Sequence, residues 1–210
     1  MLICGFLCPT FKSHGNHNVT MHIGLVSMFF PEVGGVSTST YEIGKELQKR
    51  HDVTVLCGNT KHFGEREYNG LTVFDLPMKF SFYRTLFFNK RAYDALKTLI
   101  RDSGIEIIHF QYCLFTMNFE LMKKGLTLPS VTSLNFPLDL KGVSPFDTFS
   151  SIFYRNFIKR MLRNYIRNTD YFVTTCKKDY DAVDRFSIGR DRVFNIPLGV
   201  NTEYFSPGAS

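Results

Sequence analysis

The residues best suited to chemistry stand directly after short apolar runs of the chain. One such place is the segment 31–36 (PEVGGV), which follows the apolar run at 22–27. Two adjacent glycines let a ligand approach the backbone closely, and the free N–H groups at the start of a following helix favour an anion. We therefore interpret Gly34, Gly35 and Val36 as a phosphate- or substrate-binding turn. The alternative is a tight strand-to-helix turn that binds nothing.

Two further apolar runs end in polar side chains. His109 and Gln111 stand at the end of the run at 105–110, and Asn135 follows the run at 130–134. A histidine at such a position can donate or accept a hydrogen bond, and an asparagine amide can hold a hydroxyl group with two hydrogen bonds. The alternatives are a structural histidine with satisfied hydrogen bonds, and turn chemistry for the asparagine.

Alternating apolar runs and amphipathic stretches predict the elements that position these residues. The predicted strands are 22–27, 52–57, 71–76, 105–110, 130–134, 170–175 and 192–196. The predicted helices follow the glycine turn and cover 84–102, 118–124, 146–168 and 177–186. This order predicts an α/β fold with a Rossmann-like, doubly wound parallel sheet. Ligands of such sheets bind beyond the carboxyl ends of the strands, so the three candidate places should share one edge.

Composition narrows the class of protein. The chain has 210 residues, 44% of them hydrophobic and 21% charged, which fits one globular domain. Five cysteines without framework spacing indicate reduced thiols and a cytoplasmic protein. The Cys and His residues within 1–20 match no common zinc spacing, so we expect no metal, and we interpret 1–20 as a flexible extension. No apolar run approaches the ~18 residues that span a membrane.

The net charge of +6 is concentrated in two segments that are also rich in Phe and Tyr. Residues 76–93 and 148–169 contain basic residues and no acidic ones. Such segments favour attachment to an anionic membrane surface, and the alternative is a solvated helix face packed on the sheet. RNA binding lacks a recognition motif, so we expect no nucleic-acid partner. The candidate surface residues are Arg84, Lys90, Arg91, Arg155, Lys159 and Arg163.

Four segments, in order over 21–207, resemble family 4 glycosyltransferases. They are HIGLVSMFFPEVGGVSTSTYEIGKELQKRHDVTVLC, IEIIHFQY, TDYFVTTCKKDYDAV and VFNIPLGVNTEYFSP. The resemblance implies a GT-B fold of two halves, with 21–205 as the N-terminal, acceptor-side domain and 206–210 as the start of the interdomain linker. It implies transfer of a sugar, with retention, from a nucleotide sugar to an acceptor that is lipid-linked in many such enzymes. No cofactor or metal is expected.

By the same resemblance, His109 and Asn135 are the candidate catalytic residues. Gly34, Gly35, Val36 and Gln111 are then candidates for binding the donor phosphate or the substrate. The half that should hold the nucleotide sugar is not in the sequence, so we expect the chain to be inactive alone. It would need a C-terminal domain or a partner subunit, at the cytoplasmic face of a membrane.

The chain also departs from the family pattern. Gln111 replaces the second histidine of the usual His-x-His, Asn135 stands where many relatives have a histidine, and Leu198 replaces an asparagine. The alternative function is therefore a non-catalytic binding module that works only with a partner subunit.

Overall fold

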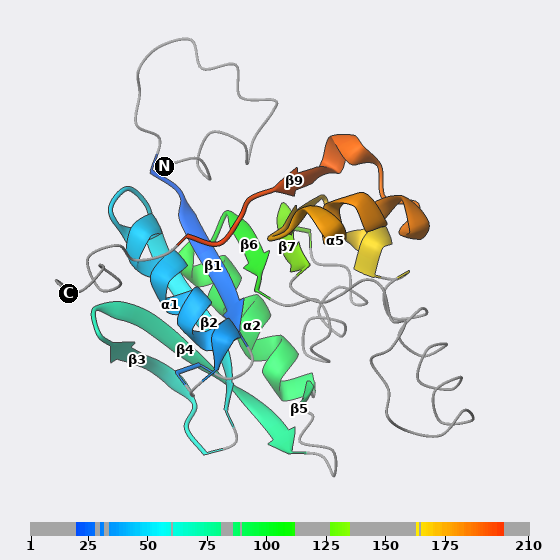
Figure 1. Ribbon diagram of the computed structural model, residues 1–210. Helices are drawn as coiled ribbons and strands as arrows, with labels where there is room; N and C mark the ends of the chain where they lie inside the picture. Colours follow the sequence, from blue (N-terminus) through cyan, green and yellow to red (C-terminus); the bar gives the residue numbers. More distant parts are fainter. Residues whose placement is uncertain are drawn as a thin grey trace, which may run out of the picture.

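A twisted sheet with helices on both faces forms the body of the protein (Figure 1). The computed structural model describes residues 20–27, 30–31, 34–59, 61–80, 86–88, 90–111, 127–134, 163 and 165–199. Several predicted features lie outside the described residues: positions 1–19 of the extension, the helix at 118–124, the linker at 206–210, and Arg84, Asn135, Arg155 and Lys159.

The strands of the sheet run mostly parallel. They are β1 (His22–Ser27), β2 (Asp52–Asn59), β3 (Gly64–Tyr68), β4 (Leu71–Phe80), β5 (Leu86–Phe88), β6 (Ile107–Phe110), β7 (Ser130–Leu134), β8 (Tyr171–Thr174) and β9 (Val193–Asn195). Their spatial order is β3-β4-β2-β1-β6-β7-β8-β9, and all neighbours from β4 to β9 are parallel. The chain winds outward to β4 on one side of β1 and outward to β9 on the other. The topological switch point therefore lies between β1 and β6, where ligands of such sheets bind.

The main helices cover opposite faces of the sheet. The helices are α1 (Gly35–Gln48), α2 (Lys90–Ser103), α5 (Lys177–Ala182) and the short 3-10 segments η1 (Val183–Phe186) and η2 (Arg190–Arg192). Leu47 of α1 packs in one core cluster with Leu25 and Val55, whereas Leu96 of α2 packs in another with Val26 and Leu56. Successive strand side chains point to opposite faces, so these clusters define an α1 face and an α2 face.

Burial on both faces explains why the strands are apolar runs of branched residues. Leu25, Val55, Leu56, Ile108 and Phe172 are completely buried. Each such side chain contributes about 1.5–3 kcal/mol when it leaves water. The predicted doubly wound parallel sheet is confirmed, with each predicted strand present within a few residues of its expected limits.

Two short antiparallel strands, β3 and β5, were not predicted. Both pair with β4, and β3 is joined to β4 by Asn69 and Gly70, whose φ angles are 49° and 82°. An Asn-Gly pair with positive φ at both residues is the preferred two-residue hairpin turn, so this signal was available in the sequence. The predicted helix at 84–102 begins only at Lys90, because residues 86–88 pair with β4 as a strand.

The later helical predictions are partly confirmed. The helix predicted at 177–186 is divided into α5 and η1. Of the helix predicted at 146–168, the described part is helical at 163 and 165–168. Its Tyr165 is buried on the α2 face, with its ring edge-on to Phe110 at 5.8 Å between ring centroids.

Close packing of α1 on the sheet gives a stability prediction. A Cβ at Gly44 would lie 3.1 and 3.2 Å from the terminal carbons of Leu71 and 3.4 Å from Leu25. Gly44→Val should therefore lower the free energy of unfolding by about 1–3 kcal/mol through overpacking, as measured by urea denaturation. In the same helix, Gly35→Val adds its Cβ where no described atom lies within 4 Å. Gly35→Val should change the free energy of unfolding by less than about 0.5 kcal/mol. An equal loss of stability in both variants would contradict the close packing of α1 at Gly44.

Candidate functional site

The predicted glycine turn leads into α1. Figure 1 shows that α1 begins at the end of the sheet where β1 ends. Gly34 is the N-cap residue and has no side chain to cap the helix, and the first turn of α1 carries no acidic residue. A Cβ at Gly34 or Gly35 would meet no atom of the described residues within 4 Å. Packing within the protein therefore does not require glycine at either position. A ligand that approaches the free N–H groups of the helix would require it, because a side chain there would block the approach.

Five hydrogen-bonding side chains form one row across the α1 face near the carboxyl ends of the strands. This polar row consists of Asp75, Cys57, Ser27, Gln111 and Ser133, none of them more than 4% exposed. The Gln111 N–H group donates to the Val26 carbonyl at 3.1 Å, which keeps it beside β1. The strand register that aligns the row pairs Asp75 with Cys57, Cys57 with Ser27, Val26 with Phe110, and Phe110 with Thr132.

His109 lies on β6 two residues before Gln111, and its ring bonds to two members of the polar row. The side-chain nitrogen Nε2 of Gln111 lies 3.3 Å from Nδ1 of His109, and Nε2 of His109 lies 2.8 Å from Oγ of Ser133. An amide nitrogen can only donate, so Nδ1 of a neutral His109 accepts and its Nε2–H donates to Ser133. The Ser133 hydroxyl is then left with its own proton to donate onward.

Burial lowers the pKa of His109 to about 4. The ring is therefore neutral at pH 7, with one tautomer fixed by its two partners. A neutral ring can orient hydroxyl groups, but it cannot supply the positive charge that would stabilise a phosphate. With 7% exposure and both ring nitrogens bonded within the protein, His109 fits the structural alternative, and its direct contact with a substrate stays a prediction.

Ser27 is a candidate site residue that the sequence pattern did not single out. It is the last residue of β1, beside the switch point, and its side chain is 1% exposed. Its Oγ has no hydrogen-bond partner within the part of the chain that the structure describes. An unpaired buried hydroxyl costs about 1–3 kcal/mol, which a bound polar group would recover. Its position at the end of the strand before the glycine turn was the available signal.

The structure therefore groups some of the predicted residues and leaves others undescribed. Gly34, Gly35 and Val36 begin α1, and His109 and Gln111 lie at the same edge of the sheet. Asn135 directly follows β7 in the chain but is outside the described residues, so its role stays a prediction.

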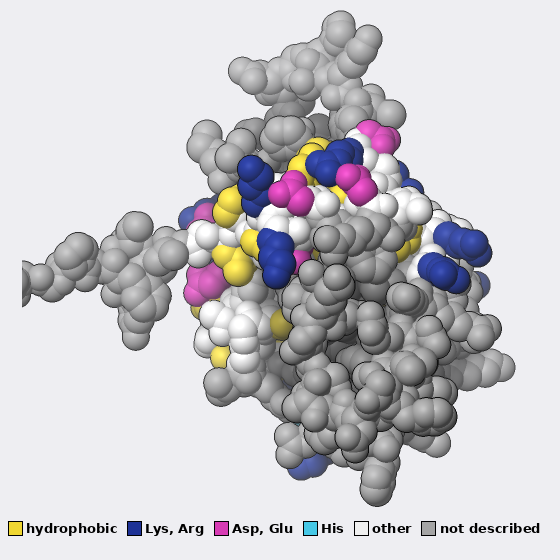
Figure 2. All heavy atoms as spheres, turned by 45° about the vertical axis from the view of Figure 1, so that its right-hand side comes forward, with side chains coloured by type: hydrophobic (Ala, Val, Ile, Leu, Met, Phe, Trp, Pro, Cys, Tyr) yellow, Lys and Arg dark blue, Asp and Glu magenta, His cyan; other side chains and the backbone are white. Residues whose placement is uncertain are grey.

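Of the predicted basic surface, Arg163 is exposed, and Lys90 and Arg91 open α2. Figure 2 shows positive and negative side chains close together on the face that includes the right-hand side of Figure 1. The exposed charged side chains described in α5 and its surroundings include both signs: Lys177, Lys178, Asp181, Asp184, Arg190 and Asp191. This neighbouring surface is therefore mixed in charge rather than basic.

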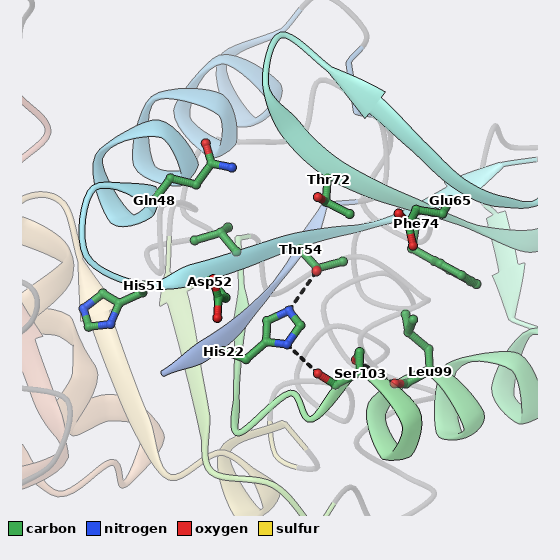
Figure 3. Close-up of a pocket in the computed structure, with 11 residues that line it drawn as sticks. His22, Gln48, His51, Asp52, Thr54, Glu65, Thr72, Phe74, Leu99 and Ser103 are labelled. Atoms are coloured by element: carbon green, nitrogen blue, oxygen red, sulfur yellow. Dashed lines mark hydrogen bonds between the residues drawn. The ribbon is translucent and has the colours of Figure 1, made fainter. Parts of the chain in front are cut away.

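A cavity of about 460 Å³ lies at the opposite edge of the sheet, beside the amino ends of β1, β2 and β4 (Figure 3). His22 stands at its centre and bonds to the Ser103 carbonyl through Nδ1 at 2.7 Å and to Oγ1 of Thr54 through Nε2 at 2.9 Å. These bonds join β1, β2 and the end of α2. Because it lies beside the amino ends of the strands, the cavity is separate from the candidate site at their carboxyl ends. Its central histidine already has hydrogen-bond partners within the protein.

Neither a metal centre nor a spanning helix is found in the described segments. Their His, Cys, Asp and Glu side chains form no group of three or more that could hold a metal ion. No helix among these segments is long and apolar enough to cross a membrane.

Comparison with solved structures identifies the fold. Sucrose-phosphate synthase from Thermosynechococcus elongatus superposes with a TM-score of 0.63 at 14% identity, covering 89% of this chain and 50% of that protein. Anabaena HepE in complex with UDP and glucose gives 0.57 at 13% identity, covering 87% and 46%. UDP-N-acetylglucosamine 2-epimerase from Rickettsia bellii gives 0.54 at 10% identity, covering 84% and 44%. The chain therefore has the fold of one half of a GT-B protein and spans about half the length of these structures.

Sequence comparison separates the family from this widely used fold. A search of curated proteins returns no significant match. The family model described as Glycosyltransferase Family 4 matches residues 33–204, which include α1, every strand from β2 onward, and His109 and Gln111. Since this match covers most of the sequence, the chain belongs to Glycosyltransferase Family 4.

Proposed function

We propose that this protein is the acceptor-side half of a glycosyltransferase that moves a sugar from a nucleotide sugar to an acceptor. The observation that carries the proposal is the polar row at the switch-point edge, beside an uncapped helix N-terminus, in a member of this family. The chain spans about half of its structural neighbours, one of which was solved with UDP and glucose. The other half would hold most of the nucleotide sugar.

In this proposal the start of α1 faces the diphosphate of the donor. The N–H groups of its first turn and the positive end of the helix dipole would stabilise the charge that develops on the leaving diphosphate. No metal is needed for this interaction, since fixed backbone donors supply it. The open space beside Gly34 and Gly35 would let the phosphate oxygens come within hydrogen-bond distance of the backbone.

The hydroxyl groups near the switch point would orient the sugar or the acceptor. Among the described residues Ser27 has no partner for its hydroxyl at the end of β1, and Ser133 retains a proton to donate while it accepts from His109. His109 would then act as a positioning residue that fixes the direction of the Ser133 hydroxyl. Asn135, directly after β7, would add an amide at the same edge. Binding between two halves would also exclude water and bring the two substrates together.

The acceptor in this proposal is lipid-linked, and transfer proceeds with retention. The basic, aromatic segments at 76–93 and 148–169 would hold the protein at an anionic membrane surface. The second candidate is a non-catalytic binding module that acts with a partner subunit. The observation that favours it is the buried His109, whose two ring nitrogens both bond within the protein.

The enzymatic proposal predicts that transfer requires more than these 210 residues. The chain alone should show no turnover with a panel of UDP- and GDP-sugars and lipid phosphates. The product of the complete natural reading frame, purified with any bound partner, should transfer a labelled sugar. Gly35→Val should reduce that transfer at least about 100-fold, because the side chain would occupy the space proposed for the diphosphate.

Gly199→Val is the matched control, since in the part of the chain that the structure describes a Cβ there also meets no atom within 4 Å. It should leave transfer unchanged. Turnover by the chain alone would contradict the role as half of an enzyme. No transfer by the complete product would reject the enzyme in favour of the binding module.

His109 predicts a specific dependence of stability on pH. Its folded pKa of about 4 lies below the usual value of 6.5, so the unfolded state binds more protons between these values. The stabilisation by neutral His109 should be complete above pH 6.5 and decline as the pH falls toward 4. The total loss should be up to about 3 kcal/mol. Urea denaturation from pH 7.5 to 4 should show this loss in the wild type and not in His109→Gln.

Exposed His62 provides the control for this experiment. The variant His62→Gln should follow the wild-type pH dependence. If the wild type and His109→Gln lose stability in parallel, the buried neutral state of His109 is refuted.

The membrane proposal predicts binding to anionic vesicles that weakens as salt rises. Each basic residue near an anionic surface contributes about 1 kcal/mol, and the Debye length falls from ~10 Å at 0.1 M to ~3 Å at 1 M salt. Co-sedimentation should therefore detect binding to anionic but not neutral vesicles, and Arg84→Glu/Lys90→Glu/Arg91→Glu should abolish it. Lys97→Glu/Lys177→Glu/Lys178→Glu changes the net charge equally at exposed positions and should retain most of it. Equal loss in both triple variants would indicate a nonspecific effect of net charge.

A further inference from the structure

Phe30, just before the glycine turn, is held on several sides. Its backbone N–H group donates to Sγ of Cys57 at 3.3 Å, and its carbonyl accepts from the Cys57 thiol at 3.0 Å. The same carbonyl accepts from Nη2 of Arg66 at 3.2 Å. Its ring lies edge-on to Tyr68 at 5.2 Å between ring centroids, and the residue is 3% exposed. This fixation places a firm anchor four residues before Gly34.

Arg66 reaches Phe30 because Asp75 orients its guanidinium group. Nε of Arg66 bonds to Oδ2 of Asp75 at 2.6 Å, and Nη2 bonds to Oδ1 at 3.2 Å. Asp75 is 1% exposed, whereas the Arg66 side chain is 30% exposed. The hydrogen bond to Asp75 raises the pKa of Arg66, so this guanidinium stays charged. The planar group can bind a carboxylate and a carbonyl together, which a lysine ammonium does less well.

The hairpin that carries Arg66 is itself attached to α1. Lys45 donates to the Asn69 carbonyl at 3.3 Å, and Gln48 donates to the Gly70 carbonyl at 2.8 Å. The β3–β4 hairpin therefore contacts the C-terminal half of α1 through its turn and the segment before α1 through Arg66. Both ends of the connection from β1 through α1 are tied to one hairpin.

We propose that Arg66 and Asp75 are positioning residues for the glycine turn, acting through the carbonyl of Phe30. Their ion pair alone is weak evidence of a stabilising role, since replacing a buried pair with apolar groups is often neutral. The additional bond to Phe30 is different, because it fixes the backbone that leads to Gly34 and Gly35. The positioning itself needs no substrate, although its importance for transfer rests on the proposed function.

Hydrogen exchange measured by mass spectrometry on the 210-residue chain tests the positioning directly. The variant Arg66→Met/Asp75→Leu removes both charges and the bond to Phe30 while keeping apolar bulk. Exchange in peptides covering 30–40 should become about tenfold faster, as expected for loss of a hydrogen bond from a charged donor. Peptides covering β7 and β8 should exchange as in the wild type.

Two further variants keep the test decisive. Arg66→Lys retains the charge pair, but a lysine cannot bond equally well to Asp75 and to the Phe30 carbonyl. Exchange at 30–40 should therefore also rise in this variant, which serves as the test if the double variant does not fold. The exposed pair of Arg190 and Asp184, 2.6 Å apart, provides the control. Arg190→Met/Asp184→Leu should leave 30–40 unchanged. Unchanged exchange at 30–40 in the Arg66 variants, or an equal rise in all peptides, would overturn the proposal.

A kinetic measurement on the complete gene product separates this inference from the proposed function. Arg66→Lys should raise the KM for the nucleotide sugar or lower kcat by about tenfold at unchanged thermal stability, while Arg190→Met/Asp184→Leu should not. A local change in exchange without any detectable transfer would support the positioning and reject the enzyme. Sugar transfer that is lost in Gly35→Val but kept in Arg66→Lys, with unchanged exchange at 30–40, would support the enzyme and overturn the positioning role of Arg66.

Discussion

A parallel sheet buried on both faces has to satisfy every polar group that it encloses, and the rest of this structure depends on that constraint. Burying a polar side chain without a partner costs roughly as much as several good packing contacts contribute. Most inward positions are accordingly Val, Ile, Leu and Phe. The polar row gathers five buried hydrogen-bonding side chains at the carboxyl edge, beside the switch point. Its two ends are satisfied within the protein, by Arg66 at Asp75 and by His109 at Ser133.

The centre of the row is where internal satisfaction fails. Ser27 retains an unpaired hydroxyl in the described part of the structure, at the end of β1, one of the two strands that flank the switch point. The row therefore combines rigid ends with a polar centre at the place where such sheets bind ligands. The row therefore places neutral hydroxyl and amide groups at its centre and its one charged member, Asp75, at its end.

The sequence predicted the elements that are buried on both faces, because their apolar runs are short and bounded by turns. The sequence pattern did not predict β3, because its residues, GEREY, include no run of apolar side chains. Exposed and half-buried side chains alternate along this strand, as expected at the edge of a sheet. The glycine turn, His109 and Gln111 were found because they follow strands. The pairing of Arg66 with Asp75, and of His109 with Ser133, depends on strand register and hairpin geometry. The Asn-Gly turn indicates the β3–β4 hairpin, but the sequence does not specify that Arg66 bonds diagonally to Asp75 across it. Nor does one sequence specify that β6 and β7 become neighbours, so these contacts could not be predicted.

Family and fold carry different information here. A synthase, HepE and an epimerase share the architecture with this chain at 10–14% identity, so the sheet alone does not determine the reaction. The family match provides the class, and the residues of the switch-point edge provide the candidate chemistry. A substitution in the β3–β4 hairpin can thus affect that edge although it lies outside the polar row, through its effect on Phe30.

The edge strand β3 also has a consequence for association between copies of the chain. It is the first strand in the sheet order, and its exposed residues Glu65 and Glu67 flank Arg66. Charged side chains on an edge strand disfavour pairing with the same strand of another molecule. At the opposite end of the order, β9 has only three residues, which offers a short template for pairing. These two features disfavour lateral growth of the sheet at both ends of the strand order.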